Sequence, residues 1–188
     1  MTPDSFASSF QVLVVDDDTS ARELLVEFFT ARGFVVAGAK DGRAAVSTLH
    51  RSNASFGLVV TDLNLPGADG FAVLQAARQA NPSSYVVIVT GYASLDSAIR
   101  AVRAGAYDYL TKPFSLSQLE VILERIHDRI SLERANRRLQ PSRTGADYAE
   151  RAGGGTLDQR LTAIERSLAR IERALDGQDL GSARGPES

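Results

Sequence analysis

Short apolar runs alternate with segments of helical spacing through about the first 130 residues of the chain. Three of the five runs are continuous blocks of Val, Ile and Leu, which is typical of strands that are covered on both faces. The runs are QVLVV (11–15), FVVAGA (34–39), FGLVVTDL (56–63), YVVIVT (85–90) and YDYLT (107–111). Strand and helix alternate at about 20–27 residues per unit, which predicts right-handed crossovers and a parallel sheet.

The segments between the runs have the spacing of amphipathic helices. ARELLVEFFTARGF stops at Gly33, a favoured C-terminal cap. Its predicted core stripe is Leu24, Leu25, Phe28 and Phe29. Three similar segments, DGRAAVSTLHRS, DGFAVLQAARQAN and SLDSAIRAVRAGA, each begin with a capping Asp or Ser. We therefore predict an α/β fold, a five-stranded parallel doubly wound sheet of flavodoxin-like (βα)₅ form with strand order 2-1-3-4-5, whose ligand site lies at the carboxyl ends of the strands.

A further helical pattern follows the last apolar run and is longer than one small sheet needs. It extends from Leu116 to about Gln140, roughly 36 Å of α-helix. Its first half is apolar on one side, whereas its last turns are mostly charged. The predicted divisions are a flexible N-terminus (1–9), a globular domain (10–130), an extension of its last helix (131–140), a linker (141–155), a short heptad helix (156–177) and a disordered tail (178–188).

The segment TLDQRLTAIERSLARIERALDG, residues 156–177, has a strict heptad seam. The a positions are Leu161, Leu168 and Leu175, and the d positions are Leu157, Ile164 and Ile171. This seam favours self-association, so that a homo-oligomer forms through residues 156–177, or docking to a partner helix. The alternative is a helix that folds back on its own domain, for which a wider apolar stripe is usual.

Composition narrows the possible chemistry. The 188 residues contain no cysteine and only two histidines, which excludes disulfides and thiolate metal sites and leaves little for a histidine-built site. A formal net charge of −2 provides no electrostatic case for wrapping nucleic acid. The first residues lack the features of a signal peptide, and no apolar run approaches the roughly 20 residues of a membrane span. We expect a cytoplasmic protein with neither a membrane nor a nucleic-acid partner.

Charged and polar side chains stand at the carboxyl ends of four predicted strands. They are Asp16, Asp17 and Asp18 after the first run, Asp62 in the third, Thr90 in the fourth and Lys112 after the fifth. Because these strand ends meet at one edge, the carboxylates would repel one another unless a cation lay among them. Oxygen ligands without histidine or sulfur indicate Mg²⁺, and a carboxylate there can act as a nucleophile toward phosphorus. Singly, each residue has an ordinary explanation as a turn, cap, strand or surface residue. Their joint occurrence favours a site.

Four segments resemble the response-regulator receiver domain of bacterial two-component signalling. They are VLVVDDD, VVTDLNLPGADGF, VIVTGYASLDSAIRA and GAYDYLTKPF, and the last two look like receivers of the nitrogen-regulation class. The resemblance covers about residues 10–130. It implies a phosphorylation switch rather than an enzyme that turns over a metabolite. The implied partners are a sensor histidine kinase or a histidine phosphotransfer protein as phosphoryl donor, and a downstream protein as target.

The resemblance also implies roles for individual residues. The implied roles are phosphoryl acceptor for Asp62, Mg²⁺ ligand for Asp16, Asp17, Asp62 and the backbone carbonyl of Asn64, phosphoryl-binding residue for Lys112 and Thr90, and aromatic switch for Tyr109. Asp18 belongs, on this analogy, to the start of the first helix. A cis Lys112–Pro113 bond is common in the family, and the sequence alone leaves it open.

Two other functions have some support in the sequence. DDDTS fits the D-x-D-x-[TS] pattern of haloacid-dehalogenase-like phosphatases, with Asp16 as nucleophile and Asp18 as acid/base. That family needs a further acidic pair at a strand end after the lysine, and this chain has a helical pattern there instead. In such a phosphatase, Asp62 would also have no role. A DNA-binding transcription factor is the other alternative. No G-x-x-x-x-G-K-[ST] loop is present, and residues 141–188 carry seven arginines against eight acidic residues, so we expect signalling through protein contacts.

Overall fold

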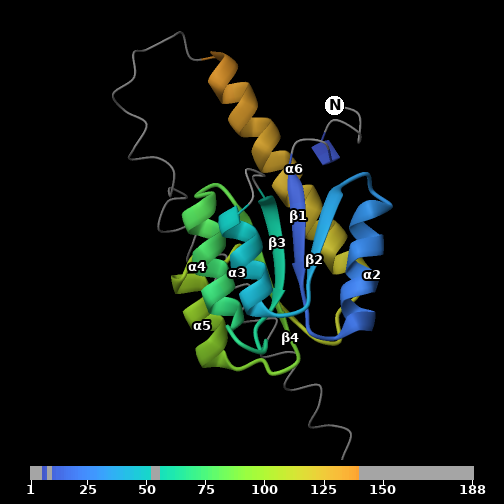
Figure 1. The fold of residues 1–188 in the computed structure, drawn as a ribbon. Helices are drawn as coiled ribbons and strands as arrows, with labels where there is room; N and C mark the ends of the chain where they lie inside the picture. The colour runs from blue at the N-terminus through green and yellow to red at the C-terminus, as the bar shows by residue number, and fades with distance from the viewer. Residues whose placement is uncertain (1–5, 8–9, 52–55, 140–188) are drawn as a thin grey trace, which may run out of the picture.

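A computed structural model of the chain describes residues 6–7, 10–51 and 56–139. In this part of the chain, five parallel strands form one sheet in the order β2-β1-β3-β4-β5 (Figure 1). The strands are β1 (Gln11–Val15), β2 (Val35–Ala39), β3 (Phe56–Asp62), β4 (Tyr85–Thr90) and β5 (Asp108–Thr111). The helices are α2 (Thr19–Thr30), α3 (Gly42–Arg51), α4 (Gly70–Ala80), α5 (Leu95–Arg103) and α6 (Leu116–Leu139). The predicted fold class and strand order are confirmed.

Two layers of apolar side chains, one on each face of the sheet, form the core. Val12 and Val14 of β1 pack in the layer of α2 and α6, whereas Leu13 and Val15 pack in the layer of α3, α4 and α5. This alternation follows from the strand geometry, in which successive side chains point to opposite faces. All seven residues of β3 are buried, as a central strand covered on both faces requires.

Capping side chains begin the helices as predicted, but the core stripe of α2 differs from the prediction at one position. The capping residues are Asp18 for α2, Asp41 for α3, Asp69 for α4 and Ser94 for α5. On α2, Leu24 is 51% exposed, whereas Leu25, Phe28 and Phe29 are buried. Since one residue advances a helix by about 100°, Leu24 lies beside the stripe that faces the sheet.

The segment before β1 also differs from the prediction. Within the range 1–9, which was predicted to be flexible, the structure buries Phe6 and Ala7. The ring of Phe6 packs edge-on against the rings of Phe10, Phe34 and His127. These contacts join residues that are far apart in the chain, so the local pattern of the first residues does not reveal them.

The last helix, α6, has 24 residues and extends beyond the sheet. The residues of its first half that are buried on the sheet are Leu119, Ile122, Leu123 and Ile126. Beyond them, α6 projects past the end of the sheet at which the strands begin (Figure 1). The segments predicted at 141–155, 156–177 and 178–188 lie outside the described residues. Within the described ranges, no helix is long and apolar enough to cross a membrane.

Candidate functional site

The strand register brings the predicted site residues to one edge of the sheet. The last residues of β1 pair with those of β3, so that Asp16 and Asp62 lie level with each other. Thr90 is the last residue of β4, and its carbonyl oxygen accepts a hydrogen bond from the Lys112 amide over 2.8 Å. The carboxyl ends of four strands therefore meet where the sequence placed them.

A lysine ammonium joins two of the carboxylates. The Nζ atom of Lys112 lies 2.7 Å from Oδ2 of Asp16 and 2.7 Å from Oδ2 of Asp62, and both aspartates are buried. Desolvation by burial lowers the pKa of Lys112, but the hydrogen bonds and negative charges of Asp16 and Asp62 raise this pKa more, so that it lies above its ordinary value. The lysine therefore stays charged and can neutralise an anion beside Asp62.

Hydrogen-bond donors also contact the other oxygens of Asp16 and Asp62. Oδ1 of Asp16 accepts from the Asp18 amide and Oδ1 of Asp62 from the Asn64 amide, each over 3.0 Å. The carbonyl oxygen of Asp16 accepts from Nη1 of Arg22 over 2.7 Å. The sequence prediction did not include Arg22. The signal that could have found it is its place early in α2, from which an arginine can reach back to the residues before the helix.

Three carboxylates form a group that fits a hard divalent cation. One oxygen each of Asp16, Asp17 and Asp62 lies within 4.8 Å of the others, and Asp17 is exposed to solvent. Carboxylate oxygens are ligands that Mg²⁺ prefers, so this donor set fits the predicted ion. Asn64, whose backbone carbonyl was predicted as a further ligand, lies beside Asp62, because its backbone amide donates a hydrogen bond to that carboxylate.

Thr90 and Tyr109 are both buried. Oγ1 of Thr90 accepts a hydrogen bond from the Tyr92 amide over 3.2 Å. Tyr109 is 5% exposed, and its hydroxyl forms a 2.8 Å hydrogen bond with Oγ of Ser97 on α5. Burial raises the pKa of the Tyr109 phenol above its ordinary value, although the hydrogen bond with Ser97 lowers this pKa in part. The sequence prediction did not include Ser97, whose only local signal is its capping box with Ser94.

Asp18 has a different place from the other two aspartates of the acidic run. Its carboxylate accepts a hydrogen bond from the Ala21 amide over 3.1 Å and so caps α2. This contact gives no support to the acid/base role that the phosphatase alternative assigned to Asp18. The Lys112–Pro113 bond, which the sequence left open, is cis.

Two glycines, one at the start of α3 and one at the start of α4, lie against the loop after Asp62, where a side chain would not fit. A Cβ on Gly70 would lie 2.3 Å from the carbonyl oxygen of Asp62, and a Cβ on Gly42 would lie 1.8 Å from the carbonyl oxygen of Ala68. Within the loop, Gly67 has φ +84°, a left-handed conformation that favours glycine. The loop is therefore pressed against the starts of both α3 and α4, and it connects Asp62 to these helices.

Comparisons with known proteins agree with this geometry. The profile of the family described as response regulator receiver domain matches residues 12–124. The chain is 34% identical over 181 residues to Protein PetR of Rhodobacter capsulatus, and the match covers 93% of this chain and 74% of PetR. It is 33% identical over 114 residues to the DNA-binding transcriptional regulator NtrC of Salmonella typhimurium, covering 61% of this chain and 24% of NtrC.

The solved structures include a CheY-like response regulator receiver domain protein from Methanospirillum hungatei JF-1. It superposes with a TM-score of 0.59 at 28% identity, over 68% of this chain and 98% of that chain. Some relatives are much longer than the match. The chain spans only 28% of the length of the Regulatory protein AtoC of Escherichia coli, and 24% of the length of NtrC.

Proposed function

The chain belongs to the response-regulator receiver family, and we propose that it is a phosphoryl-accepting switch of a two-component system, phosphorylated on Asp62. The observation that carries this proposal is the contact of Lys112 Nζ with the carboxylates of Asp16 and Asp62, at 2.7 Å each, with Asp17 beside them. A carboxylate at a strand end, next to a fixed ammonium, is suited to attack an electrophilic phosphorus and to bear the charge that results.

In the proposed step, a carboxylate oxygen of Asp62 attacks the phosphorus of a phosphohistidine on a sensor kinase or phosphotransfer protein. The O–P bond forms while the P–N bond breaks, and the bonding electron pair returns to the imidazole nitrogen, which takes up a proton. Lys112 donates to the oxygens of the transferred group. Mg²⁺ held by Asp16, Asp17, Asp62 and the carbonyl of Asn64 would supply further positive charge against those oxygens.

The signal then passes to the face formed by α5, β5 and α6. We propose that the hydroxyl of Thr90 leaves the Tyr92 amide for a phosphoryl oxygen, and that Tyr109 occupies the space this movement opens. Because the Tyr109 hydroxyl is bound to Ser97 on α5, its displacement would also move that helix. The protein would act by a shift between two populations rather than by turnover of a metabolite.

The proposed output is a contact with a downstream protein in the cytoplasm. NtrC is DNA-binding by its name, but the match covers 24% of it. In the present chain, residues 141–188 carry seven arginines against eight acidic residues, so this segment has no excess of positive charge with which to attract a nucleic acid.

The test of this function uses the full chain, Mg²⁺ and acetyl phosphate as a small phosphodonor. We expect an acid-stable, hydroxylamine-labile phosphate on Asp62, detected by mass spectrometry of peptides. Asp62→Asn should lose this phosphate, whereas the matched control Asp18→Asn should keep it, because Asp18 caps α2. Chelation of Mg²⁺ should abolish labelling. Labelling of Asp62→Asn at the wild-type rate would refute the proposal, and label on Asp16 would favour the phosphatase alternative.

A further inference from the structure

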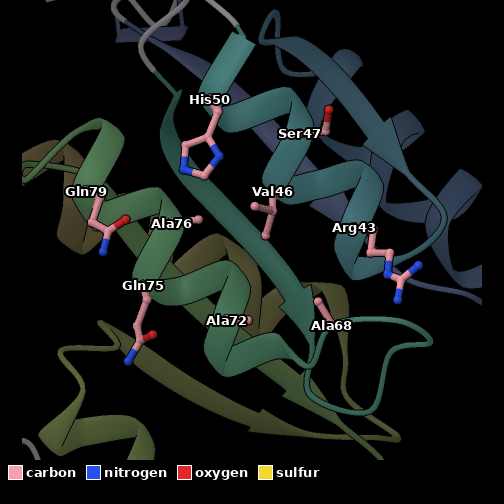
Figure 2. A pocket seen from close by; sticks show the side chains of 9 residues that line it. All are labelled: Arg43, Val46, Ser47, His50, Ala68, Ala72, Gln75, Ala76 and Gln79. Atoms are coloured by element: carbon pink, nitrogen blue, oxygen red, sulfur yellow. The ribbon is translucent and has the colours of Figure 1, made fainter.

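An open groove runs between α3 and α4, on the face of the sheet opposite α6 (Figure 2). Its floor is made of small apolar side chains, Val46 from α3 and Ala72 and Ala76 from α4, and Ala68 closes one end. Small side chains on two neighbouring helices leave a depression that larger side chains of a third helix can fill. The groove is therefore shaped for a helix with a narrow apolar seam.

The two rims of the groove differ in charge. Arg43 and His50 are exposed on the α3 rim, and Gln75 and Gln79 are exposed on the α4 rim (Figure 2). Arg43 and His50 are seven residues apart, which corresponds to about 10.5 Å along a helix. Among the residues that line the groove, the α3 rim thus presents two basic groups at a heptad spacing, and the α4 rim is uncharged.

The sequence of the predicted heptad helix, residues 156–177, has the complementary pattern. Each of its e positions, directly after a d position, is acidic: Asp158, Glu165 and Glu172. These acids repeat every seven residues, the same spacing as Arg43 and His50. We propose that this segment docks in the groove between α3 and α4 of its own chain, with Glu165 beside His50 and Glu172 beside Arg43. Its single Leu/Ile seam is too narrow for a flat sheet face but suits a groove between two helices.

The geometry of the fold sets the same direction for this helix in two independent ways. Viewed from solvent with α3 and α4 running upward, α4 lies to the left of α3 (Figure 2), as right-handed crossovers require. A right-handed helix laid on this groove turns its e positions toward α3 only when it runs antiparallel to α3 and α4. Independently, α6 ends beyond the edge of the sheet where the strands begin, which is the edge at which α3 and α4 end (Figure 1). A segment that arrives from there enters antiparallel.

The connecting residues are long enough for this path. Residues 140–155 can span at most about 55 Å when extended at about 3.5 Å per residue. The path returns along the part of α6 after Ile126, 13 residues or about 20 Å. It then crosses two layers of about 10 Å each, so the two steps together need about 40 Å at most. A connection of this length keeps the two partners at a millimolar effective concentration, so that even a weak helix–groove contact is populated.

The experiment places one nitroxide label on the full chain. Since the chain has no cysteine, Ser167→Cys, a g position on the flank expected beside α4, provides a unique attachment point. We expect paramagnetic broadening of amide signals from α3 and α4 and none from α2. A second sample mixes isotope-labelled protein without the nitroxide and unlabelled protein that carries it, and it should show no broadening. Broadening that appears in the mixed sample as well overturns docking within one chain and assigns the seam to self-association. Absence of α3 and α4 broadening from both samples overturns the proposal altogether.

Charge exchange tests the predicted register. Glu172→Arg alone and Arg43→Glu alone should each lower the docked-to-undocked ratio by roughly two- to fivefold, the range of an exposed ion pair. The two changes together should restore the ratio. Arg173→Glu, at the outward f position, is the matched control and should leave it unchanged. A double variant that docks no better than the single variants would overturn the pairing.

Discussion

At the scale of single residues, the site is defined by an imbalance of charge. Lys112 supplies one ammonium to a group of three carboxylates, and it contacts only those of Asp16 and Asp62 directly. The third carboxylate, Asp17, is exposed, and without a metal ion its charge adds repulsion. Asp17 is therefore a source of repulsion that the cation of the proposed function would offset.

This imbalance predicts opposite effects of Asp17→Asn with and without Mg²⁺. In EDTA the substitution should raise the free energy of unfolding, by up to about 1 kcal/mol, because it removes repulsion at an exposed position. With Mg²⁺ it should remove most of the stabilisation that the bound ion adds. Urea unfolding in both buffers measures the two effects, and Glu27→Gln, an exposed acid of α2 outside the cluster, is the control. A variant that is less stable than wild type in EDTA would contradict the repulsion argument.

At the scale of elements, the β3–α4 loop fastens the site to two helices. Gly42 at the start of α3 meets the carbonyl oxygen of Ala68, and Gly70 at the start of α4 meets that of Asp62. The Gly42 amide also donates to the carbonyl oxygen of Pro66 over 3.4 Å. A change in the loop after Asp62 therefore bears directly on the position of α3.

Gly42→Ala should destabilise the domain because its Cβ would lie 1.8 Å from the carbonyl oxygen of Ala68, which cannot move without shifting the loop. We expect a loss of about 1–3 kcal/mol in the free energy of unfolding, the range of overpacked sites. Gly91→Ala is the matched control, since a Cβ there meets nothing within 4 Å. Denaturant unfolding compares the two, and equal losses would show that the close approach at Gly42 is not the cause.

At the scale of the whole molecule, one side chain connects the site to the groove between α3 and α4 that is proposed to hold residues 156–177. A Cβ on Gly67, in the loop after Asp62, would lie 3.1 Å from Cγ of Arg43, so the Arg43 side chain covers this loop. Arg43 is also the rim residue proposed to pair with Glu172. A phosphoryl group on Asp62 adds negative charge near the end of the groove where Glu172 of the heptad segment 156–177 would lie.

Phosphorylation should therefore weaken docking of the heptad segment 156–177. Acetyl phosphate with Mg²⁺ is expected to reduce the broadening of α3 and α4 signals by the label at position 167. In the Asp62→Asn variant the broadening should stay the same. Mass spectrometry on the same samples separates the two proposals on which this prediction rests. Phosphorylated protein with unchanged broadening would contradict the coupling alone, whereas a protein that takes up no phosphate would contradict the proposed function.

The sequence by itself determined the sheet and the edge where the site lies. Continuous apolar blocks indicate buried parallel strands, and right-handed crossovers with short connections leave few possible strand orders. In such a sheet the residue that ends each strand falls at one common edge. For this reason the sequence was enough to place Asp16, Asp62, Thr90 and Lys112 together.

Only the tertiary structure decided which atoms meet. The burial of Phe6 against His127, the exposure of Leu24, the contact of Arg22 with the Asp16 carbonyl and the bond between Tyr109 and Ser97 had no decisive local signal. Each depends on how two elements approach and rotate against each other. That approach is set by close packing of the whole core, in which every side chain constrains its neighbours, and a pattern read along one segment contains no information about the surface of the segment that it meets.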